Sequence, residues 1–160
     1  MASQTTARNF FALPSFAVVG ASSNPVKFGH KEGLTTIAVH AWYLAHGLDV
    51  TPVNPTSAQV TVRGSDYATV PSLSALSKPR QTAVSIITPP AVTRAVLEEA
   101  RKLGVPAVWM QPGTFDDAVL DLALAEGAFD TVVYGDGGRG GEGWCVLVDG
   151  ERALKDAGKL

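Results

Sequence analysis

The sequence has little that could cross-link the chain, anchor it or hold a metal. Among its 160 residues only Cys145 is a cysteine, which excludes an internal disulfide framework and a zinc site made of cysteines alone. The longest apolar runs, such as residues 16–19, are far too short to span a membrane. The N-terminus lacks the apolar stretch of a secretory signal. We therefore expect a soluble cytoplasmic protein with no membrane partner; a mitochondrial presequence that includes Arg8 is the alternative.

Charge of either sign is also scarce. The formal net charge is −2, whereas a protein that coats nucleic acid needs a clustered excess of lysine and arginine. Nucleic acid is therefore not an expected partner. The charge is unevenly placed: residues 1–80 carry six basic and three acidic side chains, a balance of +3, and residues 81–160 carry seven against twelve, a balance of −5. The positive charge balance of residues 1–80 suits an anionic ligand.

The length and composition fit one domain with its own core. Apolar residues make up 46% of the chain. A chain of this length can bury roughly two-thirds of its unfolded surface, so it needs no metal or disulfide to hold it together. We expect residues 1–13 to form an N-terminal extension and residues 14–160 to form the domain.

Short apolar runs alternate with segments of helical periodicity. Apolar residues recur every three or four positions from Leu34 to Leu48 and from Val92 to Leu103, which predicts two helices. A third helix is expected at 115–126, a short one within 72–76 and a helical tail at the C-terminus, while the rest of 56–80 is expected to be irregular. The expected strands are residues 16–20, 49–54, 82–88, 107–111, 131–134 and 144–148. Pro52 restricts its strand to a place near a sheet edge.

Fully apolar strands that alternate with helices indicate a parallel sheet covered on both faces. Right-handed crossovers then give a doubly wound α/β fold of the Rossmann-like type. In an open parallel sheet the ligand lies beyond the carboxyl ends of the strands. The loops at those ends are residues 20–29, 54–57, 88–90 and 111–114, and they are the candidate binding loops.

The first of these loops suits a phosphate. Gly20 lets the backbone turn, Ser22 and Ser23 offer hydroxyls, Lys27 adds a positive charge, and the N–H groups at the start of the next helix attract anions. An ordinary loop whose serines cap the helix is the alternative. The loop does not match Gly-x-Gly-x-x-Gly, the dinucleotide pattern, because Ser22 and Pro25 stand where it needs glycine. Asn54 also stands where NAD sites carry an acid.

Six segments together carry a resemblance to a known family. They are Phe16-Ala-Val-Val-Gly-Ala-Ser-Ser-Asn-Pro, Lys27-Phe-Gly-His, Val53-Asn-Pro, Val70-Pro-Ser-Leu, Thr88-Pro-Pro and Val108-Trp-Met-Gln-Pro-Gly. From about residue 14 to 135 the chain resembles the single-domain coenzyme A-binding proteins. Those proteins are similar to the N-terminal domain of the alpha subunit of succinyl-coenzyme A ligase.

The resemblance implies a set of cofactor contacts. The positions that match the family's phosphate loop are Gly20, Ala21, Ser22, Ser23, Lys27 and Phe28. The resemblance further implies that the nucleotide is bordered by Asn54 and Pro55. It implies that the pantetheine path is lined by Thr88, Pro89 and Pro90, with Gln111 near the carboxyl edge of the sheet. The expected cofactor is coenzyme A or an acyl-coenzyme A, a small nucleotide whose phosphates suit Lys27.

The resemblance implies a binding module and no catalytic residue, because the ligase's phosphorylated histidine belongs to a second domain absent from this chain. No two of the histidines His30, His40 and His46 are spaced as a metal-binding pair on one face of a helix, so no metal site is expected. Two other functions stay open: an NAD(P)-dependent oxidoreductase, and an interaction protein whose nucleotide site is empty.

Three further features have no assigned role in the cofactor site. Residues 32–40 are an insertion of roughly two helical turns relative to the family, and residues 135–143 are rich in glycine. Cys145 lies in an apolar run, where buried thiols are inert. Trp42 and Tyr43 form either an exposed patch for self-association into a homo-oligomer or part of the core.

Overall fold

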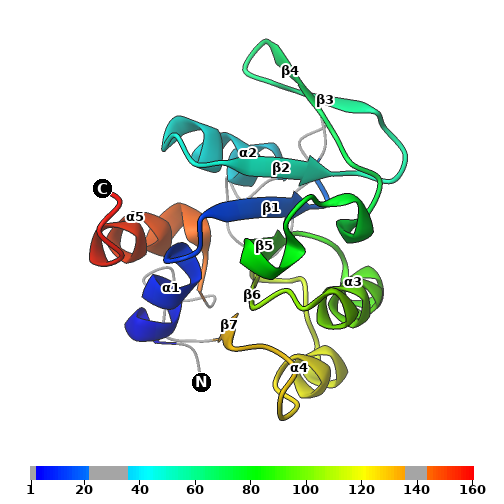
Figure 1. Ribbon diagram of the computed structural model, residues 1–160, viewed down its shortest axis with the longest axis vertical. Helices are drawn as coiled ribbons and strands as arrows, with labels where there is room; N and C mark the ends of the chain where they lie inside the picture. Colours follow the sequence, from blue (N-terminus) through cyan, green and yellow to red (C-terminus); the bar gives the residue numbers. More distant parts are fainter. Residues whose placement is uncertain (1–2, 22–35, 136–143) are drawn as a thin grey trace.

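The computed structural model describes residues 3–21, 36–135 and 144–160. At its centre is a five-stranded sheet in which every neighbouring pair of strands is parallel (Figure 1). The strands, in their order across the sheet, are β2 (Val50–Val53), β1 (Ser15–Val19), β5 (Thr82–Ile86), β6 (Ala107–Met110) and β7 (Thr131–Val133). The predicted doubly wound α/β fold is confirmed. Pro52 lies in an edge strand, which tolerates its missing N–H.

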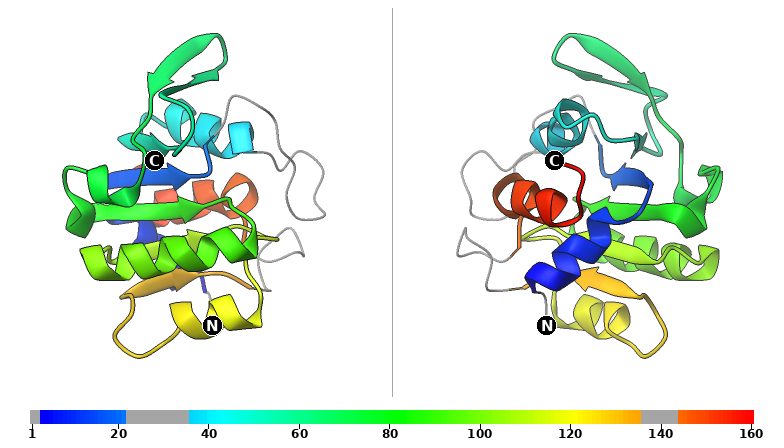
Figure 2. Two further views of the ribbon diagram at one scale, coloured as in Figure 1. Left: turned by 90° about the vertical axis from the view of Figure 1, so that its right-hand side faces the viewer. Right: turned by 60° about the vertical axis from the view of Figure 1, so that its left-hand side comes forward.

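Helices cover both faces of the sheet (Figure 2). α1 (Gln4–Phe11), α2 (Thr36–Ala45) and α5 (Val146–Asp156) pack on one face, and α3 (Pro90–Leu103) and α4 (Asp117–Ala123) pack on the other. The side chains of β1 point alternately to the two faces, as a strand requires. Phe16 and Val18 therefore join the first core cluster, and Ala17 and Val19 join the second.

The N-terminal segment forms a helix for which the sequence pattern offered no prediction. Ser3 caps α1, since its side-chain oxygen accepts a hydrogen bond from the Thr6 N–H at 3.2 Å. Phe10 and Phe11 are wholly buried, and the Phe10 ring meets the Trp109 ring edge-on with centroids 5.4 Å apart. These aromatic contacts make α1 part of the core under β6 and β7.

A two-stranded hairpin stands beside the main sheet and corrects the expectation that residues 56–80 are irregular. It consists of β3 (Gln59–Val62) and β4 (Ser65–Ala68), which pair antiparallel and project from the side of β2 (Figure 1). Its turn residues Arg63 and Gly64 both have positive φ, 51° and 80°, as a type I′ turn needs. The usual sequence signal for that turn is asparagine or aspartate before the glycine. Here arginine stands in that position, so the sequence lacks the signal.

The short helix expected within 72–76 is a 3₁₀ helix, η1 (Leu73–Ala75), and a second 3₁₀ turn, η2 (Pro79–Gln81), precedes β5. Leu73 is wholly buried in the second core cluster, between the sheet and α3. The segment therefore packs against α3 despite its irregular backbone.

Residues 144–148 lead into a helix and are not a strand, which corrects the expectation from their apolar character. The Asp149 carboxylate accepts a hydrogen bond from the Cys145 N–H at 3.1 Å and so stabilises the start of α5. The Trp109 indole N–H donates to the Trp144 carbonyl oxygen at 3.0 Å and ties this start to β6. A short apolar run has no periodicity that separates a buried strand from a buried helix.

α5 approaches α2 closely because Gly150 has no side chain. A Cβ atom at this position would lie 2.6 Å from Cζ2 and 2.9 Å from Cη2 of Trp42. Trp42 and Tyr43 are both buried in the core cluster of this face. They therefore form part of the core and not an exposed patch.

A buried histidine lies where α2 meets the hairpin. The His40 side chain is wholly buried, and its ring meets the Tyr67 ring edge-on at a centroid distance of 5.4 Å. Neither ring nitrogen has a hydrogen-bond partner within the described parts of the chain. Burial lowers the pKa of the His40 imidazole, because the charged form loses its hydration.

The contact between α5 and α2 predicts that Gly150→Ala lowers the free energy of unfolding by about 1–3 kcal/mol, because the added methyl group collides with Trp42. Where no clash occurs, replacing glycine by alanine within a helix stabilises the protein by roughly 0.5–1 kcal/mol. A loss of stability would therefore indicate the clash. Urea unfolding measures the effect, and the cost should disappear in the Trp42→Ala background. A Gly150→Ala protein as stable as the parent would contradict this packing.

The burial of His40 predicts a loss of stability in mild acid. Its folded-state pKa lies below the unfolded value of about 6.5, so the free energy of unfolding should fall as the pH drops below that value, by up to about 1.4 kcal/mol per pH unit. Urea unfolding at several pH values between pH 7.5 and 5.5 measures the slope. His40→Gln should flatten it. An unchanged slope in His40→Gln would refute the assignment.

Candidate functional site

The strand order places a topological switch point between β1 and β5. The chain continues from β1 to β2 on one side and from β5 to β6 on the other, which leaves room for a ligand between the two loops. The Ile87 N–H donates to the Val19 carbonyl oxygen at 3.0 Å. The Gly20 N–H donates to the Val53 carbonyl oxygen at 3.2 Å. The carboxyl ends of β5, β1 and β2 therefore lie side by side.

Gly20 turns the chain at this switch point in a conformation and a space that only glycine suits. Its φ is +97°, and a Cβ atom would lie 3.0 Å from Cγ1 and from the carbonyl oxygen of Ile87. The same Cβ would lie 3.1 Å from Cγ2 of Thr88. Glycine is required here because the backbone of the first loop packs directly on the end of β5.

Several of the predicted phosphate contacts lie outside the described residues. Of that set the structure describes Gly20 and Ala21, and Ala21 is buried. The others are Ser22, Ser23, Lys27 and Phe28.

Asn54 joins the loop after β2 to the turn after β1. Its side-chain amide donates to the Ala21 carbonyl oxygen at 2.9 Å. Its side-chain oxygen accepts from the backbone N–H groups of Thr56 and Ser57 at 2.8 and 3.1 Å and from the Thr56 hydroxyl at 3.0 Å. The side chain thus orders its own loop and holds Ala21, so it fixes where the first loop begins.

A largely apolar cavity of about 250 Å³ opens beside Gly20. Its walls come from the ends of β1, β2 and β5, from residues 71–73, and from one side of α3. The lining residues are Val19, Gly20, Val53, Pro55, Pro71, Ser72, Leu73, Thr88, Pro89, Val92, Val96 and Glu99. Pro55, Thr88 and Pro89, predicted to contact two different parts of the cofactor, therefore line one cavity.

The start of α3 offers few donors to an anion. Pro89 is the N-cap and Pro90 the first helical residue, and neither has an N–H. The Thr88 hydroxyl shares a hydrogen bond with the Thr93 hydroxyl at 2.9 Å. This helix end therefore presents an apolar surface to the cavity.

Gln111 lies away from the cavity in the interior. Its side chain is wholly buried, with Nε2 donating to the Ser85 hydroxyl at 3.3 Å and Oε1 accepting from the Val146 N–H at 3.0 Å. The Ser85 hydroxyl shares a further hydrogen bond with the Tyr43 hydroxyl at 2.9 Å. Burial raises the pKa of Tyr43, against the smaller effect of Ser85, so the phenol stays protonated. This network connects β6 to α2, β5 and α5.

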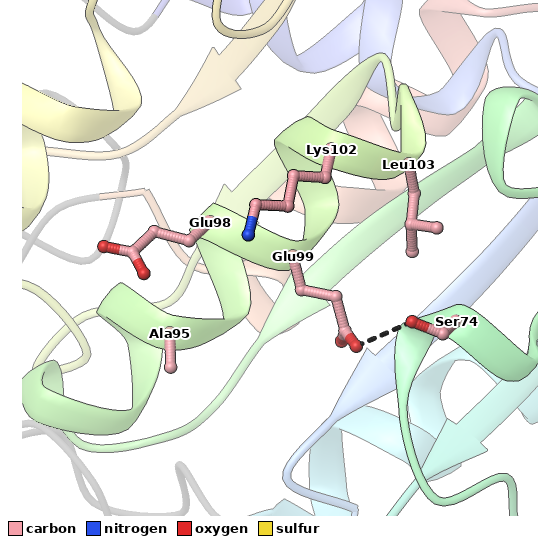
Figure 3. A pocket seen from close by; sticks show the side chains of 6 residues that line it. All are labelled: Ser74, Ala95, Glu98, Glu99, Lys102 and Leu103. Atoms are coloured by element: carbon pink, nitrogen blue, oxygen red, sulfur yellow. Dashed lines mark hydrogen bonds between the residues drawn. The ribbon is translucent and has the colours of Figure 1, made fainter.

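Glu99 is a cavity residue that sequence reasoning missed. Its two carboxylate oxygens accept from the Leu73 N–H at 3.1 Å and the Ser74 hydroxyl at 2.9 Å, which holds η1 against α3. Glu99 and Ser74 also line a second, more open hollow of about 460 Å³ (Figure 3). The lone signal in the sequence was the position of Glu99 beside the apolar stripe of its helix.

The described residues show neither a metal centre nor a membrane helix. No group of three or more histidine, cysteine, aspartate or glutamate side chains within ranges 3–21, 36–135 and 144–160 could hold a metal ion. In the same ranges no helix is both long and apolar enough to cross a membrane. Cys145 is buried, as its apolar surroundings predicted.

Comparison with known proteins agrees with this geometry. A hypothetical protein from Pyrococcus horikoshii OT3 is 25% identical over 95% of this chain and 92% of its own, with a TM-score of 0.69. A conserved hypothetical protein from Pyrococcus furiosus is 28% identical over 66% and 81%, with a TM-score of 0.54. A Thermus thermophilus protein, cell-free ID.343, is 23% identical over 94% and 98%, with a TM-score of 0.65, and shares the fold.

Curated proteins give no match to this sequence. The family model described as the CoA binding domain matches residues 14–134, which include the switch point and the walls of the apolar cavity. The chain therefore belongs to the CoA-binding domain family.

Proposed function

We propose that this protein binds coenzyme A or an acyl-coenzyme A at the switch point between β1 and β5. The observation that carries the proposal is the Gly20 turn, whose backbone packs on Ile87 and Thr88 beside an apolar cavity. Membership of the CoA-binding domain family supports the same cofactor. A backbone without a side chain at this point leaves room for a diphosphate to approach the N–H groups of the loop.

The cofactor is proposed to lie across the site in two parts. Its diphosphate would lie over the loop after Gly20, with Lys27 as a counter-charge. The cavity of about 250 Å³ is smaller than the roughly 300–1,000 Å³ of sites that enclose a whole drug-sized ligand, so it would take one segment of the cofactor. The adenine ring suits it best, because the ring is flat and apolar side chains, among them Val53, Pro55, Val92 and Val96, line the cavity.

We further propose an accessory role, in which the protein carries or senses the cofactor without transforming it. Among the residues that line the cavity, Glu99 alone is charged, and both of its oxygens already hold η1. The described residues that line the cavity include no histidine, cysteine or lysine that could serve as a general base or nucleophile.

Titration calorimetry with coenzyme A, acetyl-coenzyme A, NAD and NADP tests the proposed ligand. We expect the two coenzyme A compounds to bind with a Kd on the order of 1 μM, equivalent to about −8 kcal/mol, and both dinucleotides to bind at least about tenfold more weakly. Absence of coenzyme A binding at millimolar concentration, or a preference for NAD or NADP, would refute the proposal.

A substitution at the turn tests the location. Gly20→Ala is expected to weaken coenzyme A binding by about tenfold or more, because the new Cβ forces the turn away from Ile87 and strains a backbone with positive φ. Gly127→Ala is the matched control, since Gly127 also has positive φ, +74°, but has no atom within 4 Å of the added Cβ. It should lose stability and keep the affinity. A folded Gly20→Ala protein with the parent's affinity would exclude this loop.

A further inference from the structure

Glu99 has an unusual place for a charged side chain. It lies on α3 with its side chain directed at Ser74, whereas the neighbouring Glu98 points away from that contact (Figure 3). Glu99 contributes to the apolar cavity together with Val92 and Val96, and Glu98 does not. Glu99 is half-buried, and a ligand that fills this largely apolar cavity would remove water from the carboxylate, which favours a ligand that brings a hydrogen-bond donor.

The Glu99 carboxylate keeps acceptor capacity after its contacts within the protein. Each oxygen accepts one hydrogen bond, from the Leu73 N–H and from the Ser74 hydroxyl. An ionised carboxylate offers about four acceptor positions, so about two are left. The two existing hydrogen bonds also fix the carboxylate in place, which lowers the entropic cost of a further hydrogen bond.

The donor that fits this position is an amino group on a flat, apolar ring. Glu99 shares α3 with Val92 and Val96, and the lining of the cavity also includes Val53 and Pro55. A heteroaromatic ring can fill such a space while an exocyclic amine at its edge donates to the carboxylate. Adenine has one such amine, attached to carbon 6.

We propose that Glu99 reads the 6-amino group of the adenine ring of coenzyme A, and is therefore a specificity-determining residue of the site. This inference rests on the proposed function. It assigns the base to the cavity and leaves the pantetheine arm to pass Thr88 and Pro89 on its way out. A hydrogen bond to a charged group inside apolar walls contributes more than one between neutral groups in water.

The test compares coenzyme A with 1,N6-ethenocoenzyme A, in which a two-carbon bridge removes both hydrogens of the 6-amino group. Titration of the wild-type protein is expected to show at least about tenfold tighter binding of coenzyme A. Glu99→Gln replaces one acceptor oxygen with a donor and keeps the other, and it should reduce the preference to about threefold or less. The added bulk of the bridge is the same in both proteins, so the change in preference isolates the contact with the amine.

Two variants separate reading of the base from other effects. Glu98→Gln removes a negative charge one position along the same helix and should leave the preference at its wild-type value. Ser74→Ala removes one hydrogen bond of Glu99 without changing the lining of the cavity, so it reports on the anchoring of η1 alone. It should also retain most of the preference.

The outcomes distinguish this inference from the function on which it rests. If coenzyme A binds and the preference is equal in wild type and Glu99→Gln, or if wild type shows none, Glu99 does not read the base. Failure of coenzyme A itself to bind wild type would instead remove the proposed function. A preference lost equally in Glu98→Gln would point to the general negative potential of α3 and would also overturn the inference.

Discussion

The proposed binding site depends on the direct packing of one backbone turn on the end of a neighbouring strand. Gly20 leaves β1 with positive φ and lies so close to Ile87 and Thr88 that no Cβ fits between them. Because β1 and β5 flank the switch point, this contact determines where the first loop leaves the sheet. A side chain here would fill the space beside the cavity and separate the loop from the β5 end.

The surrounding contacts keep that turn and the cavity in shape. Asn54 bonds to the Ala21 carbonyl oxygen and so ties the first loop to the second. Glu99 holds η1 against α3 from the other side. These polar contacts lie at the ends of strands and between loops, while the sheet is covered by two apolar clusters. The core supports a rigid edge, and a few hydrogen bonds shape the loops on it, which is the arrangement that a preorganised site requires.

The fold was predictable from the sequence because its strands are short apolar runs that alternate with helices of clear periodicity. The loop residues near Gly20, Pro55 and Thr88 were predictable too, since parallel strands bring their carboxyl ends to one edge. Other features left no such signal. The start of α5 is an apolar run that fits a strand equally well, and α1 is a helix of only 8 residues, too short to repeat its buried pattern of Ala7, Phe10 and Phe11.

Near the site, the surroundings of two side chains also left no signal in the sequence. Gln111 follows a buried strand, as a ligand-binding residue can, but its amide binds Ser85 and the start of α5 in the interior. Glu99 lies on a helix, outside every candidate loop, and lines the cavity where η1 packs against that helix. Tertiary contacts of this kind cannot be deduced from residue types and spacing.

The most direct test of the account is a crystal structure of the protein with coenzyme A. The account predicts the diphosphate beside the Gly20 turn and one end of the cofactor in the cavity between Pro55 and Val96. Coenzyme A bound elsewhere, with the Gly20 turn and this cavity both vacant, would contradict it.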